Sequence, residues 1–418
     1  MTEHWDLIII GGGASGLAAA AAIARSGARL SVLVLEQADR PGKKLLATGN
    51  GRCNLYNTGL SAERFVSRSP KALSACLQTV LQTDQPAFWR DLGLMTVEQD
   101  EGRAYPASLQ ASAVADTLRA AAQAGGAELH CGQRVTALQK SGGNFIITTA
   151  SGARHTAGRV ILAAGGRAAP KLGATGDGYA LAAGLGHSCV PTVPGLVPVR
   201  CVNPGRTLPG VRNAAEVTLS RGGQVLAVRR GEVQFTEYGV SGIVIMDLSS
   251  RMIPGEPHTL TLDLMPDRTA AELSAFLREK VRNHPEQRAA FLLLGVMKRQ
   301  LGEVILRACR VDGKRRLLAS LTEEELSRIV QRIKGWTMQT EGTLSWEQAQ
   351  ITCGGIPPDE VRPDTFESRR VPDLYLTGEL LDAAGDCGGF NLAWAFGSGI
   401  AAGRSAAMRT DPRAGNAR

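Results

Sequence analysis

A run of small residues near the beginning of the sequence has the spacing of a phosphate-binding loop. Gly11, Gly13 and Gly16 form the pattern G-x-G-x-x-G, with Ala14 and Ser15 between the last two glycines. In such a loop the first glycine makes a tight turn, the second lets backbone approach a pyrophosphate, and the third allows close helix packing. The following helix N-terminus attracts phosphate charge. The pattern therefore predicts a dinucleotide site.

The segments around this loop have the order of strand, helix, strand and acid that such a site requires. Residues 6–10 are an apolar run typical of a strand, and the alanine-rich residues 17–24 predict a helix. A second apolar run, residues 30–35, ends at Glu36, which follows Gly16 by 20 residues. A carboxylate at this spacing accepts hydrogen bonds from an adenosine ribose.

A late segment of the sequence indicates that the dinucleotide is FAD rather than NAD. Residues 373–377 predict a strand, and an alanine-rich and glycine-rich helix is expected from about Leu392. In flavoproteins with two dinucleotide-type folds, a strand in this place meets the flavin's ribityl and pyrophosphate portion. The next helix points its N-terminus at the isoalloxazine, where it stabilises negative charge on the reduced ring. The candidate contacts here are Gly378, Glu379, Gly389, Phe390 and Asn391.

A third apolar strand, expected over residues 160–166 with glycines at its end, returns the chain to the cofactor through Ala164 and Gly165. A meander of short strands precedes it, and Val135 in the first of them is a further candidate contact. These strands are expected over residues 134–138, 145–149 and 153–156. Taken alone, the segment also fits a buried strand that ends in a turn.

A polar, glycine-rich loop after the second strand supplies further candidate cofactor contacts, namely Lys43, Lys44, Thr48, Gly49, Asn50, Arg52 and Cys53. Its cations could bind the pyrophosphate or an anionic substrate, or be ordinary solvated charge. Arg103 and Tyr105 are candidates for the substrate side, although Tyr105 also fits a structural turn before a proline.

Two cysteines, Cys53 and Cys387, lie in loops that are expected to approach the flavin. Either thiol could protonate a substrate carbon while a hydride arrives at its neighbour, because a partly exposed thiol is easily tuned. The alternative is that both side chains only pack. A disulfide between them depends on a distance that the sequence does not give.

These motifs together resemble a bacterial family of NAD(P)/FAD-dependent oxidoreductases that includes aminoacetone-oxidase-like and bile-acid-reductase-like flavoproteins. The resemblance covers nearly the whole chain, and its motifs are residues 47–54, 102–106, 175–179, 235–242, 352–356 and 388–391. It implies an α/β fold in which a discontinuous Rossmann-type FAD-binding domain holds an inserted β-rich domain and a nested helical domain.

The composition of the chain changes at places that agree with this division. Prolines and glycines become frequent from Pro191, where short strands are expected at residues 216–219 and 225–228, and the pattern turns helical after Pro266. Thr322 and Glu325 form a capping box before a helix with one apolar face. The expected domains are residues 1–190 with 350–418 for FAD, 191–266 with 336–349 for the β-rich insert, and 267–335 for the helical insert.

The overall composition excludes several classes of protein. The eight cysteines include no Cys-x-x-Cys pair and the six histidines have no ligand spacing, so we expect neither a disulfide scaffold nor a metal site. The uncharged residues 7–24 lack a preceding basic segment and contain the glycine loop, so we expect a cytoplasmic protein without a membrane span. The oligomeric state is left open.

The sequence predicts an FAD-dependent oxidoreductase acting on an unidentified small-molecule substrate. No second dinucleotide fingerprint follows, so NAD(P)H is expected to dock only transiently as the reductant. An alternative is an RNA-modifying flavoenzyme that reduces uridine to dihydrouridine in ribosomal RNA, and another is a flavin-binding protein without turnover. A basic cluster favours RNA but also fits a solvated helical face: Lys298, Arg299, Arg307, Arg310, Lys314, Arg315 and Arg316.

Overall fold

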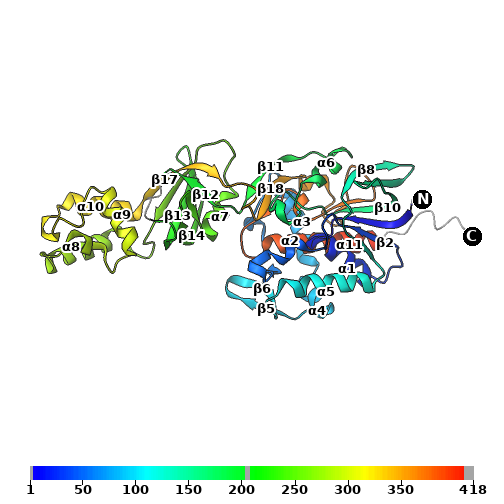
Figure 1. The fold of residues 1–418 in the computed structure, drawn as a ribbon, viewed down its shortest axis with the longest axis horizontal. Helices are drawn as coiled ribbons and strands as arrows, with labels where there is room; N and C mark the ends of the chain where they lie inside the picture. Colours follow the sequence, from blue (N-terminus) through cyan, green and yellow to red (C-terminus); the bar gives the residue numbers. More distant parts are fainter. Residues whose placement is uncertain (1–2, 203–207, 409–418) are drawn as a thin grey trace, which may run out of the picture. The chain divides into compact units, whose positions relative to one another are not determined.

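The computed structural model describes residues 3–202 and 208–408. The chain divides into two compact units: a discontinuous unit, Met1–Pro194 with Ala349–Arg418, and an inserted unit, Gly195–Gln348 (Figure 1). The finer division of the inserted part into a β-rich and a helical domain stays a prediction.

A parallel sheet forms the centre of the discontinuous unit. Ile10 is paired with Leu35 on one side and with Leu162 on the other, and Leu162 is paired in turn with Leu376. Because the strands run the same way, their carboxyl ends meet at one edge, which we call the carboxyl edge. The parallel strands, in order across the sheet, are β7 (Glu128–His130), β2 (Val32–Leu35), β1 (Glu3–Ile10), β10 (Arg154–Leu162) and β19 (Leu374–Leu376).

The expected meander is present, but its last strand is longer than the sequence suggested. The strands β8 (Val135–Ser141) and β9 (Asn144–Thr149) are antiparallel to each other, and β9 pairs with the first half of β10. The second half of β10 pairs with β19. The segments expected separately over residues 153–156 and 160–166 are therefore one strand, which ends at Leu162, since β1 hydrogen-bonds along both halves and Gly158 does not interrupt it.

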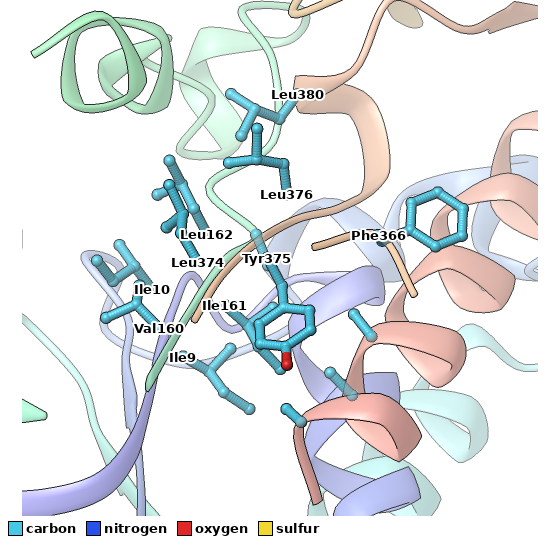
Figure 2. Close-up of a cluster of buried hydrophobic side chains, with 14 of the residues drawn as sticks. Ile9, Ile10, Val160, Ile161, Leu162, Phe366, Leu374, Tyr375, Leu376 and Leu380 are labelled. Atoms are coloured by element: carbon cyan, nitrogen blue, oxygen red, sulfur yellow. The ribbon is translucent and has the colours of Figure 1, made fainter. Parts of the chain in front are cut away.

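The strands around the carboxyl edge form an apolar core, shown in Figure 2. Ile9, Ile161 and Leu374 are fully buried, and Tyr375 is 1% exposed. Strands that are buried on both faces read as continuous apolar runs instead of alternating ones. This explains why these three strands were visible in the sequence.

Two helices pack against each other through small residues. Helix α1 (Ala14–Arg25) follows β1, and helix α11 (Phe390–Met408) follows β19. A Cβ atom at Gly399 would lie 2.2 Å from the carbonyl oxygen of Ser15, and one at Gly403 would lie 2.5 Å from that of Ala19. The backbones of the two helices are therefore too close for side chains at these two glycines.

Further elements complete the discontinuous unit. The helices are α2 (Lys43–Leu46), α3 (Pro70–Gln82), α4 (Gln85–Asp91), α5 (Ala111–Ala124) and α6 (Asp177–Ala183). The short strands β3 (Tyr56–Asn57), β5 (Thr96–Gln99) and β6 (Arg103–Pro106) form one small sheet, β4 (Phe65–Val66) pairs with β20 (Ala384–Gly385), and β11 (Val190–Gly195) pairs with β18 (Ile351–Gly355).

The inserted unit contains a closed barrel and a group of helices (Figure 1). The barrel strands, in order around it, are β12 (Val199–Cys201), β15 (Gly239–Ser241), β14 (Gln224–Phe235), β13 (Arg212–Arg221), β16 (Thr259–Asp263) and β17 (Trp336–Thr343). The helices are α7 (Ile243–Ser249), α8 (Ala270–Asn283), α9 (Arg299–Ala308) and α10 (Glu323–Lys334). The capping box of Thr322 and Glu325 is confirmed at the start of α10.

Within residues 3–202 and 208–408, no helix has both the length and the hydropathy to cross a membrane. The same residues contain no group of three or more histidine, cysteine, aspartate or glutamate side chains arranged to hold a metal ion.

Candidate functional site

The loops that leave the parallel strands are hydrogen-bonded to one another at the carboxyl edge. The backbone N–H of Gly11 donates to the carbonyl oxygen of Leu35 at 2.8 Å, and that of Thr377 donates to Leu162 at 3.2 Å. The glycine loop, the Glu36 loop and the Gly378 loop therefore meet in one place, as the crevice position of a nucleotide in an open α/β sheet requires.

The three glycines of the first loop have different surroundings. A Cβ at Gly16 would lie 1.9 Å from the carbonyl oxygen of Gly11, and a Cβ at Gly11 would lie 2.4 Å from that of Ala163. A Cβ at Gly13 would meet no protein atom within 4 Å, and Gly13 is the N-cap of α1. Two glycines thus permit close packing, while the third leaves open space before the helix N-terminus.

The carboxylate of Glu36 is held in place by backbone groups. Its Oε2 accepts from the N–H of Gly12 at 2.8 Å, and its Oε1 accepts from that of Ala38 at 2.7 Å. Both oxygens keep a lone pair for other donors, such as ribose hydroxyls. The nearby meander starts at Val135, which lines a hollow of about 370 Å³ together with the ion-paired Arg134.

The two lysines of the polar loop are paired with carboxylates. The Nζ atom of Lys44 lies 2.7 Å from Oε2 of Glu379, whose Oε1 accepts from the backbone N–H of Thr352 at 2.7 Å. Lys43 lies 3.4 Å from Asp39 and lowers the pKa of that exposed carboxyl. Lys44 and Glu379 were expected as separate cofactor contacts, and the structure joins them in one ion pair.

The rest of the polar loop divides into an exposed part and a buried part. Gly49 and Asn50 are exposed, and the Arg52 guanidinium lies 5.0 Å from the centre of the Tyr105 ring. Cys53 is fully buried and is not in a disulfide. Burial raises the pKa of its thiol to about 12, against a smaller lowering by the hydrogen bond with Thr48. Cys53 therefore stays protonated.

Side-chain hydrogen bonds to the backbone hold the loop before α11 in place, a role that the sequence did not predict for these residues. The amide of Asn391 accepts from the Gly385 N–H and donates to the Gly385 carbonyl, both at 2.8 Å. Asn57 donates to the carbonyl oxygen of Gly388 at 2.8 Å. Nε of Arg103 lies 3.5 Å from the position of a Cβ at Gly388, next to the half-buried Cys387. Arg103 thus lies beside Gly388, the residue that follows Cys387, whereas Cys53 lies in the core.

The Gly378 loop is fixed by three residues that sequence reasoning missed. Thr377 accepts from the Ser15 hydroxyl at 2.6 Å, Ser398 accepts from the Gly378 N–H at 2.9 Å, and the indole of Trp394 donates to the Gly378 carbonyl at 2.9 Å. For Ser398 and Trp394 the available signal was a buried polar atom on the otherwise apolar helix α11, whereas Thr377 follows strand β19 and gave no such signal.

The start of α11 carries the remaining predicted contacts. Gly389 has φ +100°, and a Cβ there would lie 2.6 Å from Oδ1 of Asn54. Phe390 is buried with its ring 6.4 Å from that of Phe65, in an edge-to-face arrangement. On the β10 loop, Gly165 has φ +70° and open space at its Cβ position, and Ala164 packs next to Gly178.

A second polar cluster lies apart from these residues. Nδ1 of His187 is 2.5 Å from Oε2 of Glu360, and the Ser368 hydroxyl is 2.9 Å from Nε2 of the same ring. Arg370 and Ser188 also donate to Glu360. The His187 side chain has no exposed surface, so the cluster is structural despite its resemblance to a hydrolytic triad.

The residues at the carboxyl edge fit a flavin dinucleotide. Open space at Gly13 and Gly165 leaves room for a pyrophosphate, and the first N–H groups of α1 and α11 have no acceptor within their helices. The two lone pairs of Glu36 fit a ribose. Near α11, the buried Oδ1 of Asn54 has no hydrogen-bond partner among the described residues, so a polar group can still be accepted there.

Comparison with known sequences agrees with this geometry. Residues 5–405 match the HI0933-like protein Rossmann domain. The chain is 38% identical over 407 residues to the 3-dehydro-bile acid delta(4,6)-reductase of Clostridium scindens, which covers 96% of this chain and 98% of the relative. It is 29% identical over 400 residues to the ribosomal RNA dihydrouridine synthase of Escherichia coli, with 95% and 96% covered.

Solved structures share the fold at low sequence identity. The 3-ketosteroid delta1-dehydrogenase of Sterolibacterium denitrificans is 16% identical with a TM-score of 0.51, over 97% of this chain and all of that one. The 3-ketosteroid-delta4-(5alpha)-dehydrogenase of Rhodococcus jostii is also 16% identical, with a TM-score of 0.50 and 97% of each chain covered.

Proposed function

This chain is a flavin-dependent oxidoreductase of the HI0933-like Rossmann family, and we propose that it reduces a carbon–carbon double bond of a small organic substrate, with NAD(P)H as a transiently docked electron donor. The observation that carries the proposal is the convergence of the glycine loop, Glu36 and the α11 N-terminus at one edge. Two relatives, a delta(4,6)-reductase and a dihydrouridine synthase, are named for reduction of such a bond.

The chain's own groups divide the work of holding the cofactor. Backbone N–H groups at the start of α1 would bind the pyrophosphate, and Glu36 would accept from the adenosine ribose. The N-terminus of α11 would favour negative charge on the flavin ring. When bound, FAD supplies the hydride that reaches one carbon of the double bond.

The second hydrogen must arrive as a proton on the neighbouring carbon. Cys53 and Cys387 are the candidates from the sequence, and their exposure distinguishes them. Cys53 has no exposed surface, so a substrate atom reaches it only if the polar loop opens. Cys387 is half-buried in the loop before α11, and Arg103 lies beside the next residue, Gly388. We therefore favour Cys387 as the proton donor, with Arg103 lining the substrate side.

A transient donor agrees with the described architecture. The parallel sheet of the discontinuous unit provides one glycine loop of the dinucleotide type, and the inserted unit is built on an antiparallel barrel. NAD(P)H and substrate would then reach the cofactor in turn. One NAD(P)H and one proton are consumed for each double bond reduced.

The proposal is tested with purified protein. Under anaerobic conditions, NADH or NADPH should bleach the flavin, and an enone such as a 4-en-3-one steroid should restore the colour and gain two hydrogens by mass spectrometry. A flavin that no reduced nicotinamide bleaches would contradict the donor. A flavin that no activated alkene reoxidises would contradict the substrate class.

A second candidate function is reduction of uridine in ribosomal RNA. Residues 267–335 carry 15 lysines and arginines against 9 acidic residues, which gives +6 of the chain's net charge of +8. Among the described residues, however, Arg299, Arg315 and Arg316 are paired with carboxylates. Of the seven cations in the basic cluster named from the sequence, the described side chains of Lys298, Arg307, Arg310 and Lys314 are exposed and have no such acidic partner.

Mass spectrometry of ribosomal RNA nucleosides separates the two candidates. A strain without this gene should keep every modified uridine of its parent if the substrate is a small molecule. Loss of dihydrouridine in the deletion strain, restored by the gene, would replace the first proposal with the second. The salt dependence of RNA binding would then report the phosphate contacts of the basic helices.

A further inference from the structure

Asn54 is a buried side chain with an unused hydrogen-bond acceptor. It is 8% exposed, and within residues 3–202 and 208–408 its Oδ1 has no hydrogen-bond partner. Leaving a buried acceptor unpaired costs about 1–3 kcal/mol, so buried polar atoms nearly always have a partner in the working protein. The adjacent residues, Cys53 and Leu55, are fully buried and fix the backbone on both sides.

The unpaired oxygen lies at the N-terminus of a long helix. It is 2.6 Å from the position that a Cβ would take at Gly389, the residue before the first turn of α11. The first hydrogen bond of that helix runs from the Ala393 N–H to the Gly389 carbonyl at 2.9 Å. The N–H groups of Phe390, Asn391 and Leu392 therefore have no acceptor inside the helix.

This arrangement places one acceptor beside several donors. Its complement is a cyclic imide edge, in which an N–H stands between two carbonyl oxygens. The pyrimidine ring of an isoalloxazine presents such an edge, and the rest of the molecule fits a flavin at the same place. The neutral amide of Asn54 accepts from an N–H without adding a negative charge where the reduced ring carries one.

We propose that Asn54 accepts the imide N–H of the flavin ring, while the first N–H groups of α11 donate to a neighbouring carbonyl oxygen. The inference rests on the proposed FAD binding. It adds a residue that recognises the isoalloxazine ring, the part of FAD that is reduced and reoxidised. Gly389 is required in this arrangement because any side chain there would meet the Asn54 amide and the Tyr56 carbonyl, 2.7 Å away.

The test compares FAD with N3-methyl-FAD, in which a methyl group replaces the imide hydrogen. Apoprotein is titrated with each flavin, and binding is followed by flavin fluorescence. The wild-type chain is expected to bind N3-methyl-FAD about tenfold more weakly, the equivalent of one hydrogen bond. Asn54→Leu is expected to bind FAD about tenfold more weakly and to lose nothing further with N3-methyl-FAD.

Two variants keep this test informative. Asn54→Asp has the same shape and an acceptor, so it should still prefer FAD over N3-methyl-FAD, even if Asn54→Leu folds poorly. Asn391→Ala loosens the Gly385 loop and should weaken both flavins equally. Asn283→Leu, on the exposed end of α8 in the inserted unit, should change neither affinity.

The outcomes distinguish this inference from the proposed function. If Asn54→Leu binds FAD as the wild type does, or if its loss adds to that of the methyl group, Asn54 does not contact the imide. FAD binding by the wild type would in that case leave the oxidoreductase proposal standing. A wild-type chain that binds neither flavin would overturn both.

Discussion

Two neighbouring glycines provide a sharp test of how the first loop works, because the same substitution should damage different properties at each. Gly13→Ala adds a methyl group to open space, whereas Gly16→Ala adds it 1.9 Å from the carbonyl oxygen of Gly11. We expect Gly13→Ala to fold normally and lose FAD. We expect Gly16→Ala to lose stability even without FAD.

The magnitudes follow from the surroundings. Gly13 has φ −81°, which alanine adopts without strain. Alanine lowers the entropy of the unfolded chain by about 0.4–1 kcal/mol but is a poorer N-cap by a similar amount, so the apoprotein's free energy of unfolding should change by less than about 1 kcal/mol. At Gly16 the backbone of Gly11 must move, which costs about 3 kcal/mol.

Urea denaturation of the apoprotein measures the first property, and fluorescence titration with FAD measures the second. Gly13→Ala should bind FAD at least about 100-fold more weakly, since the methyl group occupies the space at the helix N-terminus that a phosphate needs. Wild-type affinity in this variant would refute the placement of the pyrophosphate in front of Gly13. Wild-type stability in Gly16→Ala would refute the close contact between loop and helix.

Three further predictions concern other parts of the discontinuous unit. Cys387→Ala should retain FAD but reduce substrate at least about 100-fold more slowly in stopped-flow assays, and full turnover in this variant would leave Cys387 a packing residue. Cys53→Ala should instead lower the free energy of unfolding by about 1–2 kcal/mol. Gly399→Val, whose Cβ would lie 2.2 Å from the Ser15 carbonyl, should separate α1 from α11 and unfold at lower urea concentration, and an unchanged midpoint would speak against that contact. Burial alone would raise the pKa of Glu360, but hydrogen bonds from its neighbours lower it to about 2. The folded state thus binds this proton less tightly than the unfolded chain, and up to about 3 kcal/mol of stability present above pH 4.5 is lost toward pH 2. Glu360→Gln should flatten that dependence in urea titrations at several pH values, and an unaltered slope would exclude Glu360 as its source.

The sequence predicted the parallel part of the fold well, for a physical reason. Residues 6–10 and 373–377 were expected as strands, and the structure has them as Glu3–Ile10 and Leu374–Leu376. Such strands are apolar on both faces, which makes them visible as continuous runs. The barrel hairpin was seen only in part, as short strands at residues 216–219 and 225–228. Its strands β13 and β14 are longer because backbone pairing continues through polar and exposed positions.

The candidate site was predicted where backbone conformation dictates residue type, and missed where contacts join distant segments. The glycine positions could be predicted, because only glycine tolerates a contact such as the one at Gly16. The ion pair of Lys44 with Glu379 joins residues 335 positions apart. The buried Oδ1 of Asn54 lies beside Gly389, which is also distant from it in the sequence. Neither relation leaves a periodic or spacing pattern. Lys44, Glu379 and Gly389 were therefore expected at the site, but their pairing was not, and Asn54 was not among the expected contacts.

The discontinuity of the cofactor-holding unit also shapes how the chain is made. Ser15 finds its partner Thr377 only after 362 further residues have been added, including the whole inserted unit. Until then the second half of β10 is an apolar strand edge without its neighbour β19, a surface to which other nascent chains can adhere. The inserted unit has its own core and can fold in the interval. Emergence of β19 and α11 from the ribosome therefore completes the sheet and ends the period in which a chaperone would be needed.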